Sequence, residues 1–152
     1  MPVLVIGADH PVGLEIVRQL AAPDREVRAF ITSPDIGPDL RRLGVKVAVG
    51  DLSDESHITA AASRCFSLIM IEAALTDGRE LAFADSEKTK LAWSRAAAQA
   101  GVTRAIWVGD RPPTIATTES VVVGVGGRAA QEVAAEAVRL DEVAELPVRP
   151  QP

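Results

Sequence analysis

Tyrosine is absent from this 152-residue sequence, and only one cysteine, Cys65, is present. A single cysteine excludes an intramolecular disulfide, and the apolar neighbours of Cys65 predict a small core residue rather than a catalytic thiol. No apolar run approaches the roughly 20 residues that span a bilayer, and no basic leader region follows Met1. We therefore expect a cytoplasmic protein that has no membrane as a partner.

Lysine is also scarce, and acidic residues outnumber basic ones. The net charge is −5, and lysine occurs only as Lys46, Lys88 and Lys90. Nucleic acids are bound by clustered lysine and arginine, and because no such cluster occurs we expect no nucleic-acid partner. The hydrophobic content of 47% and the charged content of 24% are instead typical of a globular chain with the size of one domain.

Five short runs rich in valine and isoleucine predict strands that are covered on both faces. They span residues 3–6, 27–31, 45–49, 66–71 and 105–108. Helical patterns separate them; these begin at Pro11, cover 37–43, begin near Asp54, and cover 85–100 up to Gly101. The alternation predicts an α/β fold, a single doubly wound Rossmann-type domain with a central parallel sheet flanked by helices.

The domain is expected to span residues 1–152, with five βα units over about 1–110. A variable strand–helix region over about 111–152 follows. In it "SVVVGVGG" predicts a sixth strand, and "RAAQEVAAEAVRLDEVAEL" predicts a last helix.

The stretch "VLVIGADHPVGLEIVRQL" (Val3 to Leu20) combines a strand, a tight turn and a helix. It resembles the opening of the extended and atypical short-chain dehydrogenase/reductase superfamily, whose loop is G-x-x-G-x-x-G, with Gly7 and Gly13 at the first and third glycines. "GVKVAVGDLSD" resembles the family's third strand and the Asp-Leu pair near the adenine. "AAAQAGVTRAIWVG" and the terminal "LPVRP" resemble segments of NmrA-like members.

The resemblance implies a dinucleotide, NAD or NADP, as the ligand. The first glycine permits the tight turn, the second lets the backbone approach the pyrophosphate, and the third lets the helix pack on the strand. The cofactor-binding positions that the resemblance implies are Gly7, His10, Pro11, Val12, Gly13, Thr32, Ser33, Asp51 and Leu52.

Position 10, where the family has its second glycine, is histidine. Two roles follow for His10: an imidazolium at a helix N-terminus would bind an anion, whereas a bulky neutral ring would obstruct the cofactor. Asp9 adds a negative charge that repels phosphate and favours obstruction, and we favour that role. Either Asp9 or His10 is expected to cap the helix.

The end of the second strand normally selects the cofactor, by an acidic residue for NAD or an arginine for NADP. Here it carries Thr32 and Ser33 and no charged selector. Their hydroxyls are able to bind a phosphate, so NADP stays open, and simple turn residues are the alternative.

The reductases that the sequence resembles use a tyrosine, a lysine four residues later and a serine after the fifth strand. This chain has no tyrosine, and Gly109 and Asp110 follow its fifth strand. Glu72 at the end of the fourth strand is the one weak candidate for a catalytic base, and we favour a solvated edge residue there. Asp51, Asp54, Glu55 and an exposed His57 form an acidic cluster that suits a helix start, so we expect no metal.

Three hypotheses result. The first is a catalytically degenerate NAD(P)-binding-like protein that acts as a redox or cofactor sensor or an interaction module. The second is an NAD(P)H-dependent oxidoreductase or epimerase-like enzyme that works without the Tyr–Lys pair. The third is a structural homodimer with an empty cleft, for which the alanine-rich helix over 85–100 would supply the face unless its alanines pack on the sheet.

Overall fold

One six-stranded sheet organises residues 1–146, the part of the chain that the computed structural model describes. Its order is β3-β2-β1-β4-β5-β6 and every neighbouring pair is parallel. The strands are β1 (Val3–Ile6), β2 (Val27–Ile31), β3 (Lys46–Val49), β4 (Ser67–Ile71), β5 (Arg104–Val108) and β6 (Glu119–Val123). The predicted parallel sheet is confirmed. Every residue of β1, β4 and β5 is buried, whereas the edge strands β3 and β6 are partly exposed, so the expected burial on both faces holds only for the central strands.

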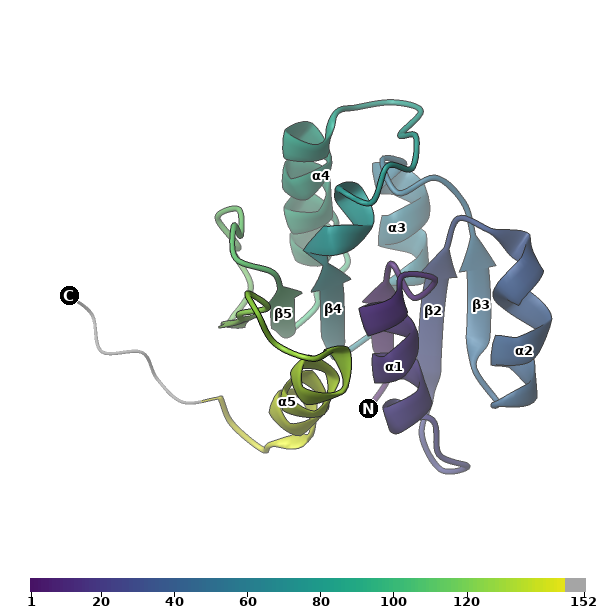
Figure 1. Ribbon diagram of the computed structural model, residues 1–152. Coiled ribbons are helices and arrows are strands. Elements are labelled where there is room, and N and C mark those ends of the chain that lie inside the picture. The colour runs from purple at the N-terminus through teal and green to yellow at the C-terminus, as the bar shows by residue number, and fades with distance from the viewer. Residues whose placement is uncertain (147–152) are drawn as a thin grey trace.

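Helices cover both faces of the sheet (Figure 1). α1 (Pro11–Leu20) and α5 (Ala130–Glu142) pack together on one face, and α3 (Glu55–Ala61) and α4 (Ser86–Gln99) pack together on the other. The short α2 (Gly37–Arg42) packs against β3, and two 3-10 turns, η1 (Pro34–Ile36) and η2 (Glu72–Leu75), follow β2 and β4. The predicted Rossmann-type α/β domain is therefore confirmed.

The helices begin where their polar caps predict. The carboxylate of Asp54 accepts from the amide of His57 at 3.2 Å, and that of Asp85 accepts from the amide of Lys88 at 2.9 Å. α4 ends before Gly101, which has a φ of +74°.

The alanines of α4 serve the interior of the domain. Ala92, Ala96 and Ala97 are buried, and Trp93 of the same helix contacts Trp107 of β5 with 5.9 Å between ring centroids. These alanines pack within the domain, so they do not form the exposed dimer face considered from the sequence.

The last helix is shorter than its sequence predicts. α5 ends at Glu142 because the buried guanidinium of Arg104 takes the carbonyl oxygens at its end. Its Nη1 lies 2.9 Å from the oxygen of Leu140, 3.0 Å from that of Asp141 and 2.6 Å from that of Val143. A cation on β5 therefore terminates a helix that helical periodicity alone would extend.

The connection from β5 to β6, residues 109–118, contains no helix. It runs along α4, where Nζ of Lys90 donates to the oxygen of Arg111 at 3.1 Å and Oγ of Ser94 donates to the oxygen of Thr114 at 2.6 Å. The fifth predicted unit thus has a strand without a helix of its own.

Cys65 is buried in the core, and burial raises the pKa of its thiol. Its predicted role as a small core residue is confirmed. Within residues 1–146, no helix has the length and apolar character needed to cross a membrane. The "LPVRP" segment that resembles a terminal strand lies, beyond Leu146, outside the described residues.

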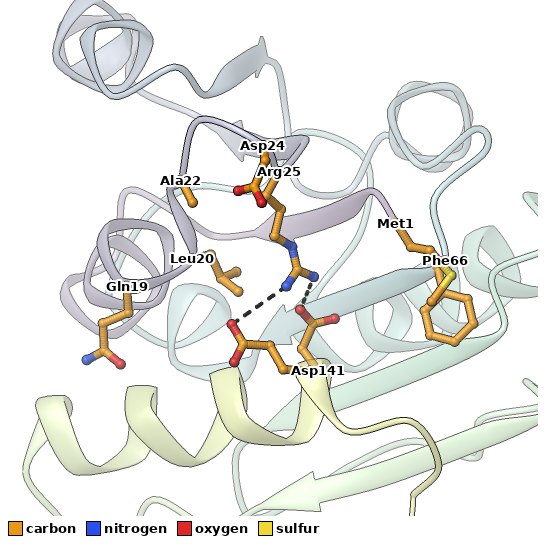
Figure 2. A pocket seen from close by; sticks show the side chains of 9 residues that line it. Met1, Gln19, Leu20, Ala22, Asp24, Arg25, Phe66 and Asp141 are labelled. Carbon is orange, nitrogen blue, oxygen red and sulfur yellow. Dashed lines mark hydrogen bonds and ion pairs between the residues drawn. The ribbon is translucent and has the colours of Figure 1, made fainter.

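A buried ion pair joins the connection between α1 and β2 to α5, at the end of the domain opposite the carboxyl ends of the strands. Figure 2 shows the guanidinium of Arg25 pointing to the carboxylate of Asp141, whose side chain is fully buried. The same guanidinium lies 3.7 Å from the carboxylate of Glu142, the next residue of α5. We expect Arg25→Met to lower the free energy of unfolding by about 3–5 kcal/mol, because it leaves a buried carboxylate unpaired. Urea unfolding measures this change in the free energy of unfolding. Arg18→Met, on the exposed side of α1, is the matched control. Equal losses of stability in the two variants would contradict the role of the Arg25–Asp141 pair.

Candidate functional site

The strand order reverses at the centre of the sheet, where β1 lies between β2 and β4. In open α/β sheets, ligands bind in the crevice at the carboxyl ends of the strands beside such a reversal. The turn after β1, the ends of β2 and β4, and the segments that follow them therefore define the candidate site.

Two glycines give the turn after β1 its shape. Gly7 has a φ of +87°, which favours glycine, and a Cβ there would lie 2.8 Å from the Cβ of Ala74 in η2. A Cβ on Gly13 would lie only 2.2 Å from the carbonyl oxygen of Gly7. The turn that the G-x-x-G-x-x-G resemblance implies is present, and α1 packs directly on it.

His10 caps α1. Its Nδ1 accepts a hydrogen bond from the amide of Val12 at 3.2 Å, and Pro11 occupies the first helical position. Burial lowers the pKa of His10, with Arg79 acting in the same direction and Asp77 against it. Because Nδ1 is an acceptor and the pKa is lowered, the geometry fits a neutral, half-buried ring better than an imidazolium ready to bind an anion.

The amides of this turn already have acceptors. The N–H groups of Gly7 and Ala8 both donate to the oxygen of Phe30, at 3.1 and 3.3 Å, and that of His10 donates to the oxygen of Gly7 at 3.0 Å. Such amides normally face the pyrophosphate. A dinucleotide that used them would have to replace these internal bonds.

Asp9 turns away from the helix and binds the end of β2. Its Oδ2 accepts from the amide of Thr32 at 2.9 Å, from Oγ1 of Thr32 at 2.8 Å and from the amide of Ser33 at 3.1 Å. The two residues expected to choose the cofactor are therefore engaged by a carboxylate of the same chain.

Arg79 completes this cluster from a distant segment. Its Nη1 lies 2.8 Å from Oδ1 of Asp9 and 3.1 Å from Oγ1 of Thr32. Its Nη2 lies 2.6 Å from Oδ2 of Asp77, and Nε is 2.9 Å from Oδ1 of the same residue. Sequence reasoning missed Arg79, since nothing in "LTDGRELAF" indicates a contact with a residue 70 positions earlier.

The electrostatics of the cluster keep both partners charged. Burial alone would raise the pKa of Asp9, but hydrogen bonds from Arg79, Thr32 and Ser33 outweigh it and lower that pKa below 3.8. Burial also acts against the charge of Arg79, yet Asp77 and Asp9 raise its pKa. The cluster is thus an ion pair at neutral pH.

Residues 76–85, which we call the strap, run from η2 to the start of α4 and cross the carboxyl ends of the strands. Besides Arg79, two hydrogen bonds from backbone amides to side-chain oxygens hold the strap: the amide of Ala82 donates to Oδ2 of Asp51 at 3.0 Å, and that of Phe83 donates to Oγ of Ser53 at 2.9 Å. The predicted adenine-side residue Asp51 is therefore a partner of the strap.

Leu52, the other predicted adenine-side residue, is fully buried. Its carbonyl oxygen accepts from Nε1 of Trp93 in α4 at 2.8 Å. The half-buried His57 beside it contacts Phe30 with 4.9 Å between ring centroids, so its expected exposure is wrong: the ring fills the space above Gly50.

Glu72 is not the solvated edge residue we favoured from the sequence. Only 15% of its side chain is exposed, and its Oε1 accepts from Nε1 of Trp107 at 3.1 Å and from the amide of Arg111 at 2.9 Å. Lys90 lies 3.6 Å away, and a Cβ on Gly109 would meet Glu72 at 2.4 Å. Glu72 thus ties β4, β5 and the following connection together.

Two of the cavities in the described residues lie away from this crevice. One of about 430 Å³ opens beside Arg25 and Asp141, and one of about 370 Å³ lies beside Lys90 and Pro112. Neither is lined by the turn after β1. Beside the turn, the ion pair between Arg79 and Asp9 lies at the entry to the expected dinucleotide site.

The ion pair makes the stability of the fold pH-dependent. The pKa of Asp9 is lower in the folded chain than its ordinary value of 3.8. The contribution of the Asp9 carboxylate to folding stability is therefore complete at pH values above 3.8 and is lost as the pH falls through the folded-state pKa. We expect Asp9→Asn to lower the free energy of unfolding by about 1.5–3 kcal/mol at neutral pH. Urea unfolding of both forms should show that difference shrink only in acid; a difference that grows in acid would contradict the assignment.

Comparisons with known proteins agree with this geometry. The model of a family described as NAD(P)H-binding matches residues 7–114. This match covers more than half of the chain and begins at the first glycine of the turn. The chain therefore belongs to the NAD(P)H-binding family. A search of curated proteins found no match.

Solved structures with the same fold include reductases. A triphenylmethane reductase from Citrobacter sp., complexed with NADP(H), is 18% identical with a TM-score of 0.61, over 91% of this chain and 45% of that one. An NADPH-dependent quinone oxidoreductase from Escherichia coli, complexed with NADPH, is 20% identical with a TM-score of 0.58, over 70% and 36%. ChuY, an anaerobillin reductase from Escherichia coli O157:H7, is 27% identical with a TM-score of 0.56, over 72% and 51%. The chain spans about a third to a half of the length of these structures.

Proposed function

We propose that this chain is an NAD(P)H-binding sensor module that does not transfer hydride by the Tyr–Lys chemistry of its superfamily. Membership of the NAD(P)H-binding family supports the ligand. The absence of tyrosine from the sequence supports the lack of that chemistry. The sensor role follows from how the crevice is closed.

The observation that carries the proposal is the bridge from Arg79 of the strap to Asp9 of the turn, at 2.8 Å. A dinucleotide that lies across the strand ends must replace this bridge and lift Ala82 and Phe83 of the strap from Asp51 and Ser53. Binding is thereby linked to a change in an exposed segment, which is what a sensor needs for a second protein to detect its state. Phe83 of the strap, with 72% of the residue exposed, would belong to the surface that changes.

Calorimetric titration with NADH and NADPH, followed by assays of hydride transfer to a quinone, a flavin and an aldehyde panel, tests the proposal. We expect binding of at least one dinucleotide, with no turnover. Absence of heat with both ligands would refute the binding role. Hydride transfer to any of these acceptors that stays with the chain through purification would favour the oxidoreductase hypothesis. In that hypothesis the cofactor and the positioning of the substrate supply the chemistry.

His10→Gly tests whether the ring obstructs the ligand. We expect roughly tenfold tighter dinucleotide binding, because the change frees the Val12 amide for one charge-assisted hydrogen bond worth about 1.5 kcal/mol. The helix should lose little, since glycine is a tolerated cap that costs a few tenths of a kcal/mol. Weaker binding in the calorimeter would instead make His10 a ligand. His10→Asn is the control, because asparagine keeps a capping side chain for the Val12 amide and is bulkier than glycine.

A further inference from the structure

The carboxylate of Asp9 lies in a site built for an anion. Four hydrogen bonds reach it, at 2.8–3.1 Å, from the amide and hydroxyl of Thr32, the amide of Ser33 and the guanidinium of Arg79. Only 7% of the Asp9 side chain and 17% of the Arg79 side chain are exposed. A carboxylate so surrounded acts as an internal ligand of a pre-formed site.

The donors suit a larger anion better than a carboxylate. Two amides, a hydroxyl and a guanidinium match the three oxygens and roughly two negative charges of a phosphate monoester, for which arginine is the preferred cationic partner. The site also stands at the end of β2, where a cofactor of this fold presents the 2′-position of its adenosine ribose. We propose that Thr32, Ser33 and Arg79 bind the 2′-phosphate of NADP and that Asp9 is its built-in competitor, an inference that rests on the proposed function.

Arg79 is held so that it can exchange one anion for another. Nε and Nη2 of its guanidinium are bound by Asp77, while Nη1 alone reaches Asp9. Departure of the Asp9 carboxylate would therefore leave Arg79 anchored by Asp77 and facing Thr32. The selector that the end of β2 lacks in the sequence is thus supplied by the strap.

The competition predicts a preference between the two reduced cofactors. NADPH brings a phosphate that takes over the bonds of Asp9, whereas NADH must displace Asp9 and leave Arg79 with one partner fewer. A ligand that binds only the open state has its apparent affinity reduced by the fraction of molecules that are open. Removal of Asp9 should therefore strengthen NADPH binding far more than NADH binding.

The test is calorimetry on the complete chain and on Asp9→Ala, Asp9→Asn and Arg79→Gln variants. We expect the chain to bind NADPH about tenfold more tightly than NADH, Asp9→Ala to tighten NADPH by a further tenfold or so, and Arg79→Gln to abolish the preference. Asp9→Asn keeps the side-chain volume and should act in the same direction if the alanine variant fails to fold. Asp35→Asn removes one exposed charge from the same edge without touching the site and is the matched control.

Adenosine 2′-monophosphate and adenosine 5′-monophosphate separate this inference from the proposed function. We expect Asp9→Ala to bind the 2′-isomer, and Arg79→Gln in the same background to lose it. Equal affinities for NADPH and NADH in the chain and in both Asp9 variants would overturn the inference while leaving the dinucleotide role intact. If no dinucleotide binds, the proposed function fails, and preference of Asp9→Ala for the 2′-isomer still decides whether the anion site exists.

Discussion

Gly13→Ala is expected to lower the free energy of unfolding by about 3 kcal/mol, at the upper end of the cost of forcing extra volume into a packed site. A Cβ at this position would lie 2.2 Å from the oxygen of Gly7 and 3.0 Å from the Cα of Ala8. Both neighbours are backbone atoms of the turn, so no side chain can move aside. α1 would have to shift away from β1, which would also disturb its packing against α5.

Urea unfolding followed by circular dichroism measures the effect of Gly13→Ala. Gly126→Ala is the matched control, because a Cβ there meets a side-chain oxygen of Asp110 at 3.6 Å, an ordinary contact, and its φ is not positive. Stability within about 0.5 kcal/mol of the starting chain would show that the turn relaxes freely. That result would remove the close approach of α1 on which the site geometry depends.

Arg104→Met is expected to cost at least about 3–5 kcal/mol, the range for removing one partner of a buried ion pair. The side chain of Arg104 is fully buried and pairs with Glu119 at 3.0 Å. The same guanidinium holds four carbonyl oxygens at the end of α5, including that of Ala144 at 3.2 Å, and lies over the ring of Phe66. Its loss would leave these acceptors buried without a donor.

Thermal and urea unfolding test the role of Arg104. Arg139→Met removes an arginine from the exposed side of α5 and should change stability by less than about 0.5 kcal/mol. The loss of stability in Arg104→Lys should lie between those of Arg104→Met and Arg139→Met, since lysine keeps the positive charge but lacks the planar guanidinium with its several donors. An Arg104→Met variant as stable as Arg139→Met would mean that the end of α5 is held by other contacts.

The sheet was predictable from the sequence because its strands are read from composition alone. Runs such as Val3–Ile6 and Ser67–Ile71 are apolar on both faces, which only a strand between two helical layers requires. The starts of α3 and α4 followed from the caps Asp54 and Asp85. The end of α5 did not follow, since it depends on Arg104 of another element.

The candidate site was predictable only in part. The turn geometry followed from Gly7 and Gly13, because both positions exclude a side chain. The roles of Asp9 and Glu72 did not follow: their partners are Arg79 and Trp107, and only the folded chain brings them together. A local motif describes the backbone of such a site, whereas long-range ion pairs decide whether its entry is filled.

The departures from the family pattern have one structural theme. His10 stands where the resemblance places the second glycine, the carboxylate of Asp9 accepts the amide of Ser33, and the strap donates the amide of Ala82 to Asp51. Each places a group of the chain where the resemblance would place the cofactor. On our account the chain carries an internal substitute for its ligand and signals when the ligand replaces it.

Hydrogen exchange of the strap amides tests this account most directly. In the free chain the amides of Ala82 and Phe83 are bonded to Asp51 and Ser53, so they should exchange slowly compared with the exposed Gly78. With saturating NADPH, the account predicts that Ala82 and Phe83 exchange faster while the amides of β1 and β4 stay protected. Unchanged or slower exchange of Ala82 and Phe83 in the NADPH complex would contradict it.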